Sequence, residues 1–296
     1  MKTNGCLKMI LKNRIALITG ASRGIGRKIS EKFLLNGASI IICSKEIKNL
    51  EDTKAKLNKL KINKNQFIEA HALDLSNEKE TNLFCKKVIK SHPNLDIIIN
   101  CAGIHGPLGE IENYSMKELR KTLEVNLISP INICLHFLKT FKNKNYGKII
   151  NFSGGGAASP LPEMNAYSLS KVALVRFTEN LSIQLKDFNI DVNAIAPGAI
   201  LTDMNKSVLN TSPEIVGNSY YKNLRKTLKE NSGDFDLVTD LTLYLASKDS
   251  DGISGKLISA VWDDWRKFKN FKEILKKTDI YNLRRIIPDD RGQKLK

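Results

Sequence analysis

A tyrosine and a lysine at a spacing of four form the clearest reactive pair in this sequence. Tyr167 and Lys171 stand in the stretch AYSLSK, and on a helix this spacing places both side chains on one face. A tyrosine hydroxyl has an unperturbed pKa of about 10, and a neighbouring ammonium group lowers that pKa by favouring the phenolate. We therefore expect Tyr167 to give a proton to a carbonyl oxygen, or to take one from an alcohol.

Asn126, in the stretch EVNLISP, is a further candidate for the same chemistry. Pro130, four residues later, has no N–H, so the carbonyl of residue 126 loses its usual helical partner. We expect that carbonyl to hold a water molecule leading to Lys171. The alternative is a helix that the proline merely kinks.

A glycine-rich turn has the features of a phosphate site. TGASRGIG, residues 19–26, follows an apolar strand pattern and leads at once into a helical pattern. Gly20 permits a tight turn, while Gly24 and Gly26 leave room where the backbone approaches a ligand and where helix packs on strand. The N-terminus of the helix then offers free N–H groups to a pyrophosphate, which predicts a dinucleotide site.

Alternating strands and helices must position these groups. Several expected strands are apolar on both faces, as in parallel sheets that helices cover on each side. The expected strands span residues 14–19, 38–43, 67–74, 95–100, 147–153, 190–196 and 256–261. The expected helices span residues 22–36, 46–61, 78–91, 116–141, 165–188 and 235–247. This order predicts an α/β fold with a doubly wound, seven-stranded, mainly parallel sheet and helices on both faces.

Together these motifs resemble the short-chain dehydrogenase/reductase family over residues 12–261, with similarity to its 3-oxoacyl-ACP reductase-like members. The spacing T-G-x-x-x-G-x-G, the segment Asn100-Cys101-Ala102-Gly103 and the Pro197-Gly198 pair carry the resemblance. It implies a Rossmann fold in one domain over residues 1–261, with a substrate lid at 203–234. Residues 262–296 form a C-terminal extension that packs on the core or on a partner subunit.

The resemblance also implies which residues bind a nicotinamide cofactor. Asp74 in LDLS resembles the adenine contact, and Thr202 lies beyond the loop that holds the carboxamide. The full set implied is Gly20, Ser22, Arg23, Gly24, Ile25, Gly26, Ser44, Lys45, Asp74, Leu75, Asn100, Ala102, Gly103, Tyr167, Lys171, Pro197, Gly198 and Thr202.

The end of the second strand favours NADP(H) over NAD(H), although NAD(H) stays possible. An acidic residue at this point would pair with the ribose hydroxyls of NAD and repel a 2′-phosphate. The chain has Ser44 and Lys45 there, and Arg23 in the glycine turn can reach the same phosphate. The alternative is that both cations are ordinary surface residues of a basic protein.

The resemblance assigns catalytic roles to Tyr167, Lys171 and Asn126, but a serine is missing. The family's serine stands 13 residues before the tyrosine, where this chain has Gly154. Ser153 is adjacent, and Gly154-Gly155-Gly156 can turn it inward or offer backbone N–H groups to the substrate oxygen. We expect a working enzyme with a modified oxygen pocket, and Ser153 as its hydroxyl.

The amino-acid composition limits the kinds of binding partner that we expect. The net charge is +16, yet no basic run is interleaved with aromatic residues for base stacking, so nucleic acid is not expected. No apolar run reaches the roughly 20 residues of a membrane span. The five cysteines form no CxxC pair and no metal-ligand spacing, which predicts no metal site and fits a reducing cytoplasm.

The expected function is therefore an oxidoreductase that interconverts a carbonyl and a secondary alcohol with NADP(H). The lid carries several cations and tyrosines, which suits an anionic substrate, although a solvated basic helix face explains them too. The family forms homodimers or homotetramers, but the altered ending ISGKLISAVWDDW puts the usual tetramer in doubt. The alternative function is a non-catalytic NADP(H) sensor or scaffold, which Gly154 favours.

Overall fold

The computed structural model describes residues 9–230 and 235–293, and within them seven strands form one sheet. Its order is β3-β2-β1-β4-β5-β6-β7, and every neighbouring pair is parallel. The strands are β1 (Ile15–Thr19), β2 (Ser39–Ser44), β3 (Ile68–Ala72), β4 (Ile97–Asn100), β5 (Gly147–Phe152), β6 (Ile190–Ala196) and β7 (Leu257–Ser259). The predicted doubly wound α/β fold is confirmed.

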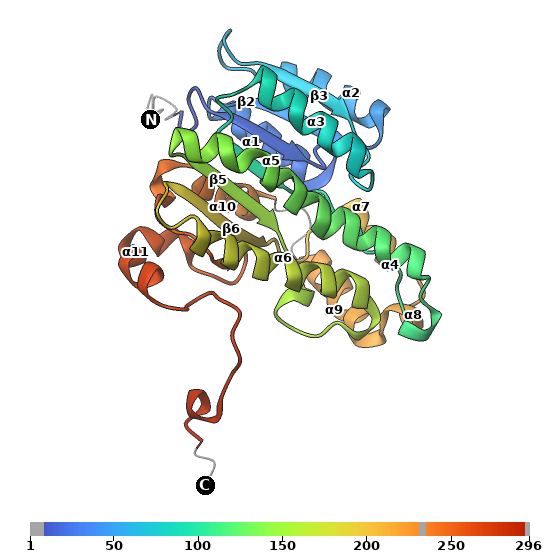
Figure 1. Ribbon diagram of the computed structural model, residues 1–296. Coiled ribbons are helices and arrows are strands. Elements are labelled where there is room, and N and C mark those ends of the chain that lie inside the picture. The colour runs from blue at the N-terminus through green and yellow to red at the C-terminus, as the bar shows by residue number, and fades with distance from the viewer. Residues whose placement is uncertain (1–8, 231–234, 294–296) are drawn as a thin grey trace, which may run out of the picture.

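Helices cover both faces of this sheet (Figure 1). Successive strand residues point to opposite faces, so Ile18 belongs to the core cluster on one face and Leu17 to the core cluster on the other. The helices are α1 (Gly24–Leu35), α2 (Ile47–Asn58), α3 (Glu78–Ser91), α4 (Met116–Leu123), α5 (Ser129–Lys144), α6 (Asn165–Gln184), α7 (Asp203–Leu209), α8 (Pro213–Val216), α9 (Asn218–Glu230), α10 (Asp236–Ala246) and α11 (Phe268–Lys277).

The strand order places the cofactor motifs at one edge of the sheet. β1 lies between β2 and β4, so the connections leaving β1 and β4 run to opposite faces. Doubly wound sheets bind their ligands at such a switch point, outside the carboxyl ends of the strands. The glycine turn follows β1, and the segment after Asn100 follows β4, so both lie at this edge.

The expected single helix over residues 116–141 is divided in the structure. It consists of α4, a π-helical turn at Glu124–Ile128, and α5. The N–H of Ser129 donates to the carbonyl of Glu124, five residues back, so the usual spacing is already broken before Pro130. A proline near a helix start costs little, since its missing N–H would have no partner there.

Three helices occupy the segment that the sequence predicts as a lid. α7, α8 and α9 follow β6 and bury the apolar residues Val208, Val216, Leu224 and Leu228 together with Met164. Tyr167 packs against the same cluster, so the lid lies directly over the expected catalytic tyrosine. The last part of the predicted lid, residues 231–234, lies outside the described residues.

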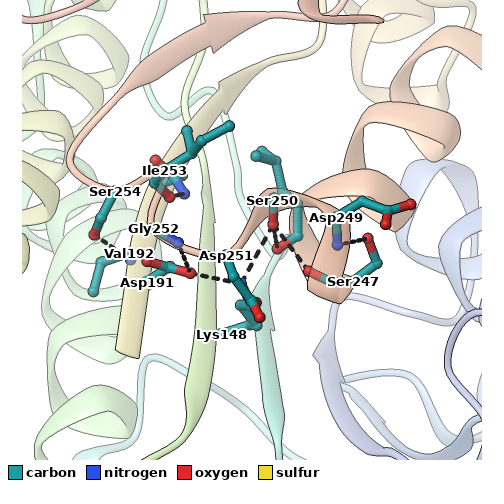
Figure 2. A network of polar contacts seen from close by, with 12 residues as sticks. Lys148, Asp191, Val192, Ser247, Asp249, Ser250, Asp251, Gly252, Ile253 and Ser254 are labelled. Atoms are coloured by element: carbon teal, nitrogen blue, oxygen red, sulfur yellow. Dashed lines mark hydrogen bonds and ion pairs between the residues drawn. The ribbon is translucent and has the colours of Figure 1, made fainter. Parts of the chain in front are cut away.

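An ion-pair network around the buried Lys148 lies at the other end of the strands from the glycine turn (Figure 2). Lys148 near the start of β5 is 1% exposed and contacts Asp191 of β6 at 2.6 Å and Asp251 at 2.7 Å. The N–H of Gly252 also donates to Asp191, at 3.1 Å. These contacts join β5, β6 and the loop before β7 at the amino ends of the strands.

The C-terminal extension packs on the domain in two places. Trp265 and Phe268 are buried against the core, whereas Trp262 is 81% exposed because it precedes the helical turn that begins at Trp265. After α11 the chain runs beside β7, where the N–H of Leu257 donates to the carbonyl of Tyr281 at 2.8 Å. The last described residues extend away from the rest of the molecule (Figure 1).

No helix in residues 9–230 or 235–293 combines the length and the apolar content that crossing a bilayer requires.

Candidate active site

Three glycines shape the turn between β1 and α1. Gly20 has φ +66°, and a Cβ on it would lie 2.8 Å from the Cα of Ala102. A Cβ on Gly26 would lie 2.6 Å from the carbonyl oxygen of Gly20, so neither position has room for a side chain. Gly24 also has positive φ, +55°, and faces the methyl group of Thr202. At these three positions the turn therefore offers only backbone, which forms a cradle beside Ala102.

The N-terminus of α1 is available to an anion. Arg23 precedes the helix without a side-chain cap, and the first turn contains no acidic residue. The first N–H groups of a helix have no intrahelical partner and attract negative charge. Ile25, predicted as a cofactor contact, has its side chain packed against the core, so only its backbone N–H can serve this site.

The predicted adenosine end combines Ser22, Ser44, Lys45 and Asp74. The Ser22 and Ser44 hydroxyls lie 2.8 Å apart, and the Lys45 ammonium lies 2.6 Å from a carboxylate oxygen of Asp74. Burial of Asp74 opposes its ionisation, but hydrogen bonds from Lys45 and Ser76 outweigh it and lower the pKa of Asp74 to about 2. These four side chains therefore form one polar group beside the glycine turn.

Two further predicted cofactor residues are placed differently. Arg23 pairs with Asp203, the first residue of the lid helix α7, at 3.3 Å. Leu75 is buried in the core beneath α3, so its side chain is not exposed to a ligand. The glycine turn and the lid are thus linked directly by an ion pair.

The segment after β4 is held by side chains around it. Thr19 Oγ1 accepts hydrogen bonds from the N–H groups of Cys101 and Ala102, both at 3.1 Å. The amide of Asn100 donates to Asn151 at 2.8 Å, and its carbonyl oxygen is buried with no partner among the described residues. These side-chain hydrogen bonds therefore fix the segment after β4 to β1 and β5.

The loop after β6 returns to the same edge. Gly198 has φ +78°, and a Cβ there would lie 2.6 Å from the side chain of Val261. Pro197 begins this loop, and Thr202 ends it by accepting a hydrogen bond from the N–H of Asn205, at 3.3 Å, as the cap of α7. The Thr202 methyl group faces Gly24, so the two loops lie side by side.

Asn126 is fully buried in the π-helical turn and fastens the loop after β4. Its amide donates to the carbonyl of Ile104 at 2.8 Å and to Ser170 at 3.0 Å, and its oxygen accepts from the N–H of Ile104 at 2.8 Å. A Cβ on Gly103 would lie 3.4 Å from Asn126 Oδ1 and 3.5 Å from Lys171 Nζ. Residues from the loop after β4, the π-helical turn and α6 therefore approach one another here.

Lys171 is buried and bound to the end of β5. Its Nζ donates to the carbonyl of Phe152 at 2.7 Å and lies 5.5 Å from the ring centroid of Tyr167. Burial lowers the pKa of Lys171 to about 8. The group therefore changes charge close to neutral pH.

The pKa of Tyr167 is raised, contrary to the expectation from its spacing to Lys171. Burial is the main cause, and the negative charge that Tyr220 acquires on ionisation adds to it. Lys171 does not reverse this effect, because its own pKa is about 8 and it is already neutral at the pH at which Tyr167 ionises. At neutral pH Tyr167 is therefore a protonated hydroxyl, the form that gives a proton.

The predicted hydroxyl of Ser153 is buried and has no hydrogen-bond partner in the described part of the chain. Gly154 is extended, with φ −173° and ψ 176°, and its Cα faces the hydroxyl of Tyr167. The turn Gly155–Ala157 follows, and the N–H groups of Gly155 and Gly156 make no hydrogen bond within the described residues. Unpaired N–H donors therefore lie in the turn that follows Gly154.

His105 is a site residue that sequence reasoning missed. Its ring stacks edge-on against Tyr167 with the centroids 5.3 Å apart, and burial, then Lys171, lowers its pKa to about 4. At neutral pH it is therefore an uncharged imidazole beside Tyr167. Its place two residues after Gly103 was the available signal.

Comparison with known proteins identifies the family of this chain. A family model described as short chain dehydrogenase matches residues 14–213. The 7α-hydroxysteroid dehydrogenase of Escherichia coli is 28% identical over 253 residues, which are 84% of this chain and 93% of that protein.

Solved structures agree as well. A 7α-hydroxysteroid dehydrogenase in complex with NADH and 7-oxo glycochenodeoxycholic acid has a TM-score of 0.74 at 26% identity, covering 87% of this chain and 96% of the other. An NADPH-dependent reductase involved in bacilysin biosynthesis has a TM-score of 0.74 at 25% identity, covering 84% and 97%.

Proposed function

Because this chain belongs to the short-chain dehydrogenase/reductase family and is an NAD(P)-dependent oxidoreductase, we propose that it prefers NADP(H) and reduces a carbonyl to a secondary alcohol with Tyr167 as the acid. The observation that carries the proposal is the close approach of Asn126 and Lys171 to Gly103, where a Cβ would lie 3.4 Å from Asn126 Oδ1 and 3.5 Å from Lys171 Nζ, beside Tyr167.

The residues present fit a dinucleotide. The cradle that a Cβ at Gly20 or Gly26 would fill, and the uncapped start of α1, suit a pyrophosphate. Asp74 suits the adenine, while the loop from Pro197 to Thr202 suits the carboxamide. When bound, the nicotinamide supplies or accepts the hydride.

The proton is the contribution of the chain itself. Tyr167 is protonated at neutral pH and donates from Oη to the carbonyl oxygen, and the nearby ammonium of Lys171 stabilises the phenolate that remains. Asn126 fixes the loop after β4 through Ile104, and its backbone carbonyl is proposed to hold the water that leads to Lys171.

The substrate oxygen needs donors besides Tyr167. The N–H groups of Gly155 and Gly156 are free of other partners, and the buried Ser153 hydroxyl is also unpaired. We propose that these groups together donate hydrogen bonds to the carbonyl oxygen of the substrate. Losing one such donor costs roughly 10²–10³ in rate, so a glycine at position 154 is compatible with catalysis.

The preference for NADP(H) rests on the polar group at the end of β2. Lys45 is 64% exposed, and with Ser44 it offers a cation and a hydroxyl to a 2′-phosphate. The relatives compared include one with NADH and one that depends on NADPH, so the residues of this chain decide the assignment.

The anionic character of the substrate is a further part of the proposal. Lys222 and Arg225 are exposed on α9, whose buried residues Leu224 and Leu228 face the domain. Replacing both cations by alanine is expected to raise the KM for an anionic ketone and not for a neutral one. An unchanged KM for every anionic ketone would leave these cations as a solvated surface.

Assembly and location complete the proposal. We expect a homodimer or homotetramer in the cytoplasm, with subunit contacts through helix faces, because residues of the extension already lie along β7. Cys43, Cys85, Cys101 and Cys134 are free thiols, which suits a reducing compartment.

The competing function is an NADP(H) sensor without chemistry, which the glycine at position 154 favours. The deciding experiment follows NADPH consumption by the purified protein against a panel of ketones, with Tyr167→Phe beside it. Tyr244→Phe is the matched control, since that hydroxyl lies on α10 and has no partner among the described residues. Turnover lost in Tyr167→Phe and kept in Tyr244→Phe supports the reductase; NADPH binding without turnover on any ketone supports the sensor.

A further inference from the structure

The hydroxyl of Tyr167 occupies the space that a side chain at position 154 would need. A Cβ built on Gly154 would fall well inside contact distance of Tyr167 Oη, 2.9 Å from Cζ and 3.0 Å from Cε1. Side-chain carbons do not approach ring atoms so closely in a packed protein. A residue larger than glycine at position 154 therefore forces the tyrosine ring to move.

The next residues show the same packing at every second position. A Cβ on Gly156 would overlap the hydroxyl of Ser168 and lie 2.9 Å from its Cβ and 3.0 Å from its Cα. Gly155, between them, faces open space with nothing within 4 Å. The first turn of α6 thus rests directly on two of the three glycines.

Backbone strain does not explain the glycine at position 154. Its φ of −173° is extended, a conformation that any residue adopts. The requirement for glycine therefore comes from the tyrosine that lies against it.

We infer that Gly154 and Gly156 are positioning residues, which let the Tyr167–Ser168 turn lie against the end of β5 and so fix the depth of the catalytic hydroxyl. Lys171 binds the carbonyl of Phe152 in the same stretch, so residues 152–154 hold both groups of the catalytic pair. The catalytic consequence rests on the proposed function. Introducing the serine that the family has at this position would displace Tyr167 and not improve the site.

A double-mutant cycle in stability tests the contact without any substrate. Gly154→Ser is expected to lower the urea midpoint of unfolding in the native background, and to lower it much less in the Tyr167→Ala background, where the colliding atoms are gone. Gly155→Ser is the matched control and is expected to change the midpoint little in either background. An equal loss from Gly154→Ser in both backgrounds, or an equal loss from Gly155→Ser, would overturn the inference.

Turnover tests the consequence for catalysis. A Cβ at position 154 must displace the hydroxyl by roughly 1 Å, and a displacement of that size can cost about 10²-fold in rate. Gly154→Ser is expected to lower kcat on that scale with the dissociation constant of NADPH unchanged. If kcat of Gly154→Ser equalled or exceeded that of the native protein, the proposed positioning role of Gly154 in catalysis would be contradicted. If the native protein turns over no ketone, the proposed function fails, while the stability cycle still decides the contact.

Discussion

Lys171 donates a hydrogen bond from Nζ to the backbone carbonyl of Phe152 at 2.7 Å, so the end of β5 holds this cation beside Tyr167. Burial at this position disfavours the charged form of Lys171 and lowers its pKa to about 8. The tyrosine behaves oppositely, since burial raises its pKa. One member of the pair therefore titrates near neutral pH, and the other stays protonated there.

A pH profile should show this titration. Reduction needs Tyr167 protonated and Lys171 charged, and raising the pH through about 8 removes the charge of Lys171. We expect kcat/KM for ketone reduction to fall as the pH rises through that value, while Tyr167 keeps its proton. The profile of kcat/KM measures the free enzyme. A constant value across this range would show that the charge of Lys171 is not needed.

Lys45 is predicted to select NADPH. Lys45→Ala should raise the KM for NADPH about tenfold, equivalent to about 1.4 kcal/mol, and leave the KM for NADH nearly unchanged. The control is Lys48→Ala, which removes the same charge from an exposed position on α2. Equal changes with both cofactors would show that Lys45 does not contact a 2′-phosphate.

The Lys148 network is predicted to be a stability element independent of the site (Figure 2). Lys148→Met leaves Asp191 buried without its closest cation and should lower the free energy of unfolding by about 3–5 kcal/mol. Adding Asp191→Asn should recover part of the loss. Lys142→Met, at an exposed position of α5, is the control, and urea unfolding measures all of them.

The same network carries a pH signature. Burial raises the pKa of Asp191 above its ordinary value, and Lys148 opposes that rise. Without Lys148 the folded-state pKa rises further, so the folded protein binds more protons than the unfolded chain. Lys148→Met should therefore regain stability as the pH is lowered towards the raised pKa. If Lys148→Met were destabilised by the same amount at every pH, the unpaired charge of Asp191 would not be the cause.

Glu179 is predicted to hold the C-terminal extension against α6. Its buried carboxylate accepts hydrogen bonds from the N–H of Leu283 at 2.6 Å and from Asn282 at 3.3 Å. Glu179→Ala should release this segment and expose the edge of β7, where Leu257 now donates to Tyr281. Amide exchange at Leu257 should quicken. Glu273→Ala, on the exposed side of α11, should leave it unchanged.

The fold could be predicted from the sequence because its signals are local. Apolar runs such as Ile40–Cys43 and the glycine turn after β1 identify parallel strands and the switch point without knowledge of distant contacts. The division of residues 116–141 was not predicted. A π-helical turn depends on how Asn126 fits against Ile104, which no periodicity reveals.

The sequence indicates which side chains of the candidate site lie near one another, but not their pKa values. Spacing identified Tyr167 and Lys171, but the direction of the pKa of Tyr167 depends on burial under the lid and on Tyr220. The sequence could not show that Lys45 and Asp74 pair, since they follow different strands. The sequence shows that Gly154 stands where the family has a serine, but only the structure shows that Gly154 lies against Tyr167.

The most direct test of the central claim is isotope transfer. The purified protein would be given NADPH deuterated at the reactive carbon, together with the ketone panel and a small-molecule extract. Products would then be searched for deuterium on the new carbinol carbon, with Tyr167→Phe in parallel. We predict a deuterated alcohol from the native protein and almost none from Tyr167→Phe. Bound NADPH with no deuterated product, or equal labelling by both proteins, would contradict a reductase that uses Tyr167 as its acid.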